Sequence, residues 1–186
     1  MNALFDTAPD FGQPIAVLKH CHDRIRKQLD TLARLPEHLA AHGADREAQH
    51  AASAVLRYFD KAAPHHHQDE EQDLLPMLDG MAEGDDRVAL DALLPELLAE
   101  HQQMDQLWNA LKTALTGIAS GASTTLSEPG ITYFSTTYRN HMHKEESTIA
   151  PMAKRLFSSE QMSTLGNAMQ QRRSVPATTG SNHVDR

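Results

Sequence analysis

The chain has 186 residues, a length that suits one compact domain with a hydrophobic core. Hydrophobic residues make up 40 % and charged residues 23 %, and no apolar run approaches the roughly 18–20 residues of a membrane-spanning helix, so neither a disordered nor a membrane protein is indicated. The formal net charge of −8 argues against a nucleic-acid partner, because phosphate binding needs clustered Lys and Arg.

The N-terminal residues and the cysteine content indicate the compartment. Residues 1–11 show no basic patch followed by a long apolar stretch, so we expect no secretory signal. The single cysteine, Cys21, has no partner for an internal disulfide, which fits a reducing cytosol. These features predict a cytoplasmic protein.

Long helices are the expected secondary structure, since Ala, Leu, Gln, Glu and Met dominate between a few breaks. The breaks fall near residues 41–44, 79–86 and 117–130, and the long segments between them cover residues 14–40, 45–78, 86–117 and 130–157. We predict an all-α fold, an antiparallel up-and-down four-helix bundle over residues 14–157. A short C-terminal helix is expected at 158–171, followed by a disordered tail at 172–186.

Histidine stands out in the composition, with 12 residues that sit mostly in short groups. In the first predicted helix, His22 interrupts an apolar stripe with steps of three and four. His66 and Glu70 interrupt the corresponding stripe of the second helix, where the interior Pro64 predicts a bend. His67 lies about 100° round the helix from His66 and is a candidate extra ligand if Pro64 distorts that turn.

The third and fourth predicted helices continue the pattern. His101 interrupts the apolar stripe of the third, and the interior Pro95 predicts a second bend. The fourth carries His141 and Glu145 on its stripe, and its motif repeats that of the second helix 75 residues on: His, Glu and Glu four and five residues later, and Pro after ten. The core-facing polar set is therefore His22, His66, Glu70, His101, His141 and Glu145.

This set is typical of a metal centre. A step of four residues returns to the same helix face, so the His and Glu of each motif point the same way. Burying two facing carboxylates costs several kcal/mol, and two divalent cations bridged by the glutamates would offset that cost. Nitrogen and oxygen ligands suit iron first, with manganese or zinc as substitutes. Glu71, Glu146 and Asp69 are expected at the edge of the centre or in solvent, and His20 and His143 in solvent.

A single buried histidine is more often a satisfied core residue than a ligand, and one His-x-x-x-Glu string is usually a surface pair. The duplicated set is what favours metal binding. A ferritin-like centre would need two Glu-x-x-His motifs plus two further glutamates. The chain has one such string, Glu47 to His50, without a partner in the fourth helix, so we reject that alternative.

The repeat resembles the hemerythrin-like (HHE cation-binding) domains, at HCHDRI (20–25), PHHHQDEEQDLLP (64–76), AEH (99–101) and HMHKEESTIAP (141–151). The resemblance covers about residues 14–157. It implies a four-helix bundle with two Fe ions in an oxo- or hydroxo-bridged di-iron site, and ligand roles for the six core-facing residues. Oxygen-carrying members have a fifth histidine one turn from another on the third helix, where this chain has Leu97 and Asp105.

The resemblance implies a protein that binds or senses O2, peroxide or nitric oxide as small ligands, with any signal leaving through a partner protein. The alternative is a di-iron enzyme that acts on peroxide or O2, or that supplies iron for repair of iron–sulfur centres. Members with the repair role carry a cysteine-bearing N-terminal region, whereas about 13 residues precede the first predicted helix here. Iron storage is a third option. The sequence leaves enzymatic activity and the oligomeric state open.

Overall fold

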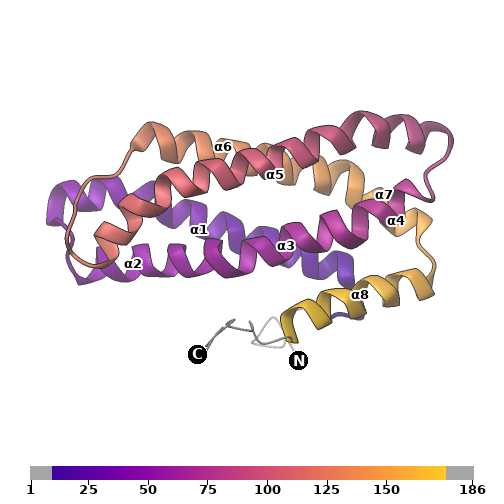
Figure 1. The fold of residues 1–186 in the computed structure, drawn as a ribbon, viewed down its shortest axis with the longest axis horizontal. Coiled ribbons are helices and arrows are strands. Elements are labelled where there is room, and N and C mark those ends of the chain that lie inside the picture. The colour runs from indigo at the N-terminus through magenta and orange to yellow at the C-terminus, as the bar shows by residue number, and fades with distance from the viewer. Residues whose placement is uncertain (1–9, 175–186) are drawn as a thin grey trace, which may run out of the picture.

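The computed structural model describes residues 10–174, and every regular element in that range is helical. Long rods lie side by side, with a last helix along one edge (Figure 1). The first rod is α1 (Pro14–His42), and the second is the continuous run α2 (Arg46–Arg57), η1 (Tyr58–Ala62), α3 (Ala63–Asp69), η2 (Glu70–Leu74) and α4 (Leu75–Asp79). The rest are α5 (Gly84–Ala119), the run α6 (Glu128–Lys144), η3 (Glu145–Ile149) and α7 (Ala150–Leu156), and α8 (Ser159–Ser174).

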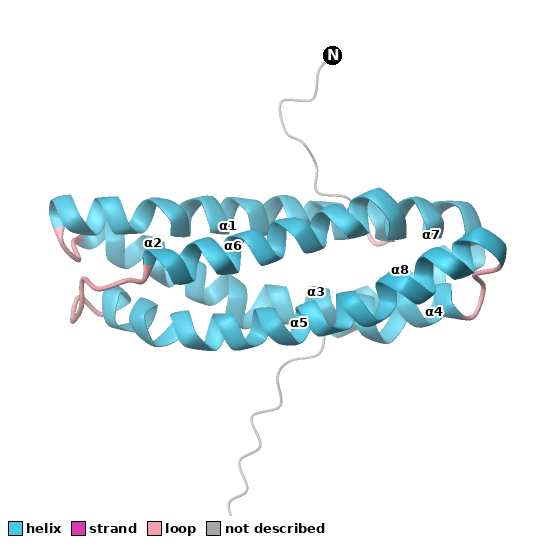
Figure 2. Ribbon diagram, turned by 90° about the horizontal axis from the view of Figure 1, so that it is seen from above, coloured by secondary structure: helices cyan, strands magenta, loops and turns pink. Residues whose placement is uncertain are grey.

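The ends of the rods follow from local chemistry. Gly43 ends α1 with a φ of 68°, a conformation that residues with a side chain rarely adopt. Asp45 then caps α2, its carboxylate accepting the Ala48 N–H at 2.9 Å, and Ser127 caps α6 in the same way through Gly130. Loops join the rods at their ends (Figure 2). The prediction of an all-helical bundle is confirmed, and α8 adds a fifth rod to the four expected long ones.

The π-helical turns η1, η2 and η3 share one sequence feature. In each case a proline is the second residue after the turn: Pro64, Pro76 and Pro151. Proline donates no N–H and its ring clashes with the carbonyl four residues earlier in an α-helix, a conflict that a wider π turn relieves. At Pro64, where the sequence predicts a bend, the rod contains the π turn η1, whereas α5 continues through Pro95 as one helix.

The C-terminal helix is longer than expected. α8 ends at Ser174 rather than at residue 171, so Arg172 and Arg173, assigned to a disordered tail, are helical. Both arginines form ion pairs with Asp69. The remaining residues of the predicted tail, 175–186, lie outside the described part of the chain.

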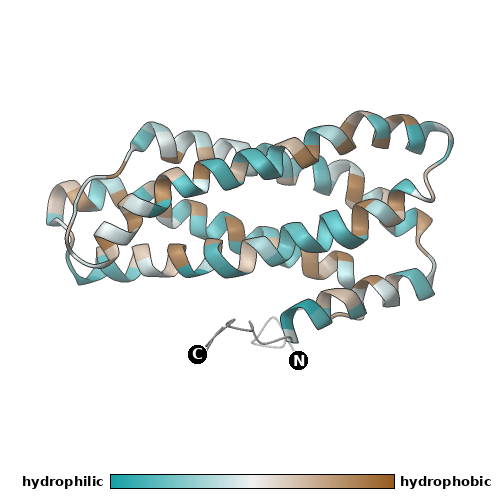
Figure 3. Ribbon diagram, in the orientation of Figure 1, coloured by the Kyte–Doolittle hydropathy of each residue, from teal (hydrophilic) through white to brown (hydrophobic). Residues whose placement is uncertain are grey.

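Two apolar clusters fill the interior. One gathers the aromatic side chains of Phe59, Trp108 and Phe134, and the other contains Leu75 and Leu165, the latter from α8. Hydrophobic and hydrophilic residues are interspersed along the rods, as expected of helices with one apolar face (Figure 3). The buried polar residues of the described chain lie outside both clusters. They are His22, His66, His67, Asp69, Glu70, His101, Thr137, His141 and Glu145. None of the described helices has a stretch long and apolar enough to cross a bilayer.

Candidate metal centre

The six predicted residues come from all four long rods and meet in the interior. α1 supplies His22, the second rod His66 and Glu70, α5 His101, and the fourth rod His141 and Glu145. Each has at most 4 % of its surface exposed. Each glutamate is the first residue of a π turn, Glu70 of η2 and Glu145 of η3, so the sequence repeat is also a repeat of local structure.

Glu70 faces histidines on two sides. Its Oε1 lies 3.2 Å from Nε2 of His66 and 3.9 Å from Nε2 of His22. Its Oε2 lies 3.4 Å from Nε2 of His101. The two oxygens of one carboxylate therefore serve different histidines.

Glu145 is arranged in the same way. Its Oε2 lies 3.1 Å from Nε2 of His22, and its Oε1 lies 3.2 Å from Nε2 of His141. The Nε2 atoms of His101 and His141 are themselves 2.9 Å apart. Two groups result, both containing the two glutamates: the His22 group adds His22 and His66, and the His101 group adds His101 and His141.

The donor atoms fit cations. Within each group one ligand atom per residue lies within 4.8 Å of all the others. Several of these atoms are buried without a hydrogen-bond partner: Nε2 of His22, Oε2 of Glu70 and both carboxylate oxygens of Glu145. They lie close to one another without aligned hydrogen bonds, as expected of atoms directed at a common point. Unpaired buried polar atoms are costly, and a cation would satisfy them together.

The buried carboxylates raise the pKa of two of the histidines. Burial alone would lower the pKa of His22, but the nearby carboxylates of Glu145 and Glu70 outweigh it and raise the pKa to about 10. Burial likewise opposes the charged form of His141, yet Glu145 and Glu100 raise its pKa to about 10. His66 differs, because burial holds its pKa well below the usual value. Cations would replace the protons on His22 and His141.

Comparison with known proteins agrees with this geometry. Residues 13–153 match the family described as the hemerythrin HHE cation-binding domain. The chain belongs to the hemerythrin HHE family. A protein from Haemophilus influenzae, described as uncharacterized, is 30 % identical over 165 residues, which cover 89 % of this chain and 92 % of that protein. The predicted resemblance is therefore confirmed, and it extends along nearly the whole bundle.

Three further carboxylates surround the candidate metal centre and contact the outer nitrogens of its histidines. Glu146 Oε1 lies 2.9 Å from Nδ1 of His22, and Glu71 Oε1 lies 2.7 Å from Nδ1 of His101. Glu100 Oε2 lies 3.0 Å from Nδ1 of His141. Such contacts fix the tautomer and the ring orientation of a metal-binding histidine.

Two basic side chains pair with these surrounding carboxylates. Arg26 donates to Glu146 at 2.8 Å, and Lys144 contacts Glu100. The sequence left Glu71 and Glu146 either at the edge of the centre or in solvent, and it did not single out Glu100, Arg26 and Lys144. Nothing in their spacing distinguishes them from the many charged residues that face solvent on amphipathic helices.

His67, the candidate extra ligand, lies next to the His101 group but outside it. Its ring stacks on that of His101 at a centroid distance of 4.2 Å, and its Nε2 lies 3.5 Å from the Tyr138 hydroxyl. Neither position one turn from His101 replaces the histidine of the oxygen carriers, since Leu97 lies in an apolar cluster and Asp105 is exposed. Of the other histidines, His143 is exposed and His20 and His65 are half-buried.

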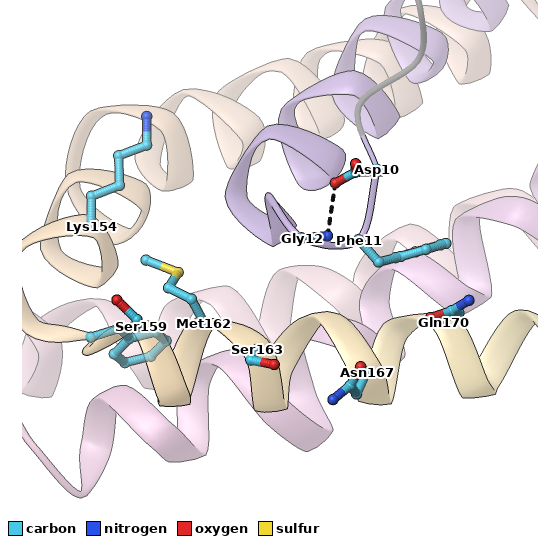
Figure 4. A pocket seen from close by; sticks show the side chains of 10 residues that line it. Asp10, Phe11, Gly12, Lys154, Ser159, Met162, Ser163, Asn167 and Gln170 are labelled. Atoms are coloured by element: carbon cyan, nitrogen blue, oxygen red, sulfur yellow. Dashed lines mark hydrogen bonds between the residues drawn. The ribbon is translucent and has the colours of Figure 1, made fainter.

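A cavity of about 230 Å³ reaches the centre from one side. His22, Glu70 and Glu145 line it together with apolar residues that include Ile15 and Leu18. It therefore borders the His22 group. A larger hollow of about 760 Å³ lies between residues 10–12, Lys154 and α8, away from every buried histidine and glutamate (Figure 4). We place the chemistry at the smaller cavity because only it contains the buried titratable groups.

Proposed function

We propose that this hemerythrin-family chain is a non-haem di-iron binding protein, built on an up-and-down four-helix bundle, that binds or senses O2, peroxide or nitric oxide. The observation that carries the proposal is that the two oxygens of each buried carboxylate face different groups of histidines. Glu70 and Glu145 each direct one oxygen to the histidines of the His22 group and the other to those of the His101 group. A carboxylate placed in this way is suited to bridge two ions.

In this assignment His22 and His66 would help to hold one ion, and His101 and His141 the other. Imidazole nitrogens with carboxylate oxygens suit iron, and manganese or zinc can occupy the same donor set. When bound, the metal pair supplies redox chemistry toward small ligands. The chain's own contribution is to orient the histidines through Glu71, Glu100 and Glu146 and to keep bulk water out of a buried site.

The size of the access cavity supports a small ligand. About 230 Å³ is below the roughly 300–1,000 Å³ of pockets for drug-sized molecules. Its lining combines apolar side chains such as Ile15 and Leu18 with His22, Glu70 and Glu145, and the cavity has room for O2, peroxide or nitric oxide. Because the cavity borders His22, the ligand would approach the ion held by His22 and His66.

Metal stoichiometry tests the proposal. Protein loaded with ferrous iron without oxygen and then freed of excess metal is expected to hold about two irons per chain, measured by elemental analysis. Chain carrying both Glu70→Ala and Glu145→Ala is the control and is expected to hold almost none. One iron or none in the native chain under these conditions would contradict the di-iron assignment.

The visible spectrum of the reduced, loaded protein separates the two classes of function. A band that appears on exposure to air and disappears again under vacuum is expected for a binding protein or sensor. Continuous consumption of added peroxide, followed through many equivalents per chain, would instead establish the enzyme alternative.

A further inference from the structure

Helix α8 is anchored to the ligand-bearing second rod by two consecutive arginines. Arg173 donates to both carboxylate oxygens of Asp69, at 3.1 Å and 2.5 Å. Arg172 donates to Asp69 as well and to Asp73 at 2.6 Å. These contacts join residues about 100 positions apart in the sequence.

Asp69 is fully buried, which makes this anchor unlike the ion pairs on the surface. Its side chain is 0 % exposed, and those of Arg172 and Arg173 are 14 % and 26 % exposed. A buried carboxylate without a partner is strongly unfavourable, whereas a bidentate arginine satisfies both oxygens with fixed geometry. The position of Asp69 is therefore tied to the position of α8.

The anchor holds the turn that presents Glu70. Asp69 directly precedes Glu70, and Asp73 lies within the same π turn, η2. Arg172 bridges the two aspartates and also reaches Gln72 at 3.2 Å. Both sides of Glu70 along the chain are thus fixed from outside the bundle.

Independent contacts fix α8 itself. Leu165 and Met169 are buried in the apolar cluster that lies beside α1, and α8 packs against α1, α3 and η2. Residues 10–12 lie across the helix (Figure 4), so close that a Cβ on Gly166 would come within 1.9 Å of the Phe11 carbonyl oxygen. The guanidinium of Arg173 also lies 5.5 Å from the centre of the Phe11 ring.

We propose that Arg172 and Arg173 are positioning residues for the bridging carboxylate of Glu70, acting through Asp69 and Asp73. They keep η2 in the conformation in which one oxygen of Glu70 faces His66 and the other faces His101. This inference rests on the proposed di-iron function, because it concerns retention of the metal pair. It assigns to α8 a role in the centre although the helix supplies none of the six ligand residues.

Metal loss to a chelator tests the proposal. The iron-loaded native chain and the variant Arg172→Gln/Arg173→Gln are mixed with excess chelator at a temperature where circular dichroism shows both to be folded. We expect the variant to lose iron about tenfold faster, the low end of the effect of removing a contact that orients a ligand. The variant Arg172→Lys/Arg173→Lys, which keeps the charge but not the bidentate contact, is expected to lie between the two.

Two controls separate positioning from general stability. Arg155→Gln removes another interhelical ion pair, with Asp86, and is expected to lose iron at the native rate. Phe134→Ala destabilises the bundle at a site remote from α8, and below its unfolding range it is also expected to retain iron like the native chain. If Phe134→Ala lost iron as fast as the arginine variant does, the proposal would be overturned.

A third variant keeps the test decisive if the arginine pair fails to fold. Arg172→Gln/Arg173→Gln with Asp69→Asn removes the buried charge together with the anchor, so it should fold while still losing iron faster than the native chain. Native-like retention in this variant would overturn the positioning role. Failure of the native chain itself to hold two irons would instead contradict the proposed function, so the two failures are distinguishable.

Discussion

At the scale of single residues, one step along a helix decides which glutamate enters the centre. Glu70 and Glu145 are 1 % and 4 % exposed, whereas the side chains of their neighbours Glu71 and Glu146 are 41 % and 30 % exposed. A rotation of about 100° per residue separates the members of each pair. The apolar stripes predicted this register, because the buried member of each pair is the one that continues the stripe.

The neighbouring glutamates make a matched set of variants. Glu70→Ala or Glu145→Ala is expected to lose most of the bound metal pair, because each removes an oxygen from both groups. Glu71→Ala or Glu146→Ala removes a contact to the outer nitrogen of a histidine but no oxygen from either group, so the metal content at saturation should stay near normal while affinity falls about 10–100-fold. Elemental analysis and metal titration measure the two effects.

The opposite ranking would show that the register is wrong by one residue. If metal content depended on Glu71 and Glu146 instead, His67 would take the place of His66 and the ligand set would have to be redrawn. His66→Ala against His65→Ala, and His141→Ala against His143→Ala, apply the same comparison to the histidines. In each pair the first residue is buried, whereas His65 is half-buried and His143 is exposed.

At the scale of helices, the sequence predicted the segments well because turn residues and apolar spacing act locally. It did not predict the π turns, since the energetic conflict at Pro64, Pro76 or Pro151 can be relieved by a kink, a helix end or a wider turn. Nor did it predict the end of α8. Polar residues at a chain end usually indicate disorder, and only the fold brings Asp69 opposite Arg172 and Arg173.

Helix α6 offers a test of the rotational position of a whole element. Phe134 is fully buried and packs at ring-centre distances of 5.1 Å from Phe59 and 5.0 Å from Tyr138. Phe134→Ala should therefore lower the free energy of unfolding by about 3–5 kcal/mol, measured by urea denaturation. The adjacent Tyr133 is 53 % exposed, so Tyr133→Ala should change stability by only about 0.5 kcal/mol. Equal losses of stability from the two substitutions would show that α6 is rotated about its axis relative to this structure.

At the scale of the whole molecule, the buried histidines and glutamates fall outside both apolar clusters. The sequence could predict that His22, His66, His101 and His141 face the interior, because each interrupts the apolar stripe of its helix. It could not predict which outer carboxylate meets which histidine. Those partners, such as Glu100 for His141, depend on how neighbouring rods face each other, and the spacing within one helix carries no such information.

Removal of metal tests this arrangement as a whole. Without cations, orphaned donor atoms and two carboxylates remain buried between helices, so the native state loses the stabilisation that binding supplies. At a free metal concentration of about 100 times the dissociation constant that stabilisation is about 2.7 kcal/mol. For a domain of this size we expect the metal-free chain to melt about 5–10 °C lower, measured by calorimetry with and without iron.

In the Glu70→Leu/Glu145→Leu variant the difference should vanish, because the bridging oxygens are gone while buried volume is kept. Equal melting temperatures for the native chain with and without iron would mean that the histidines are ordinary core residues, held by the carboxylates that already surround them.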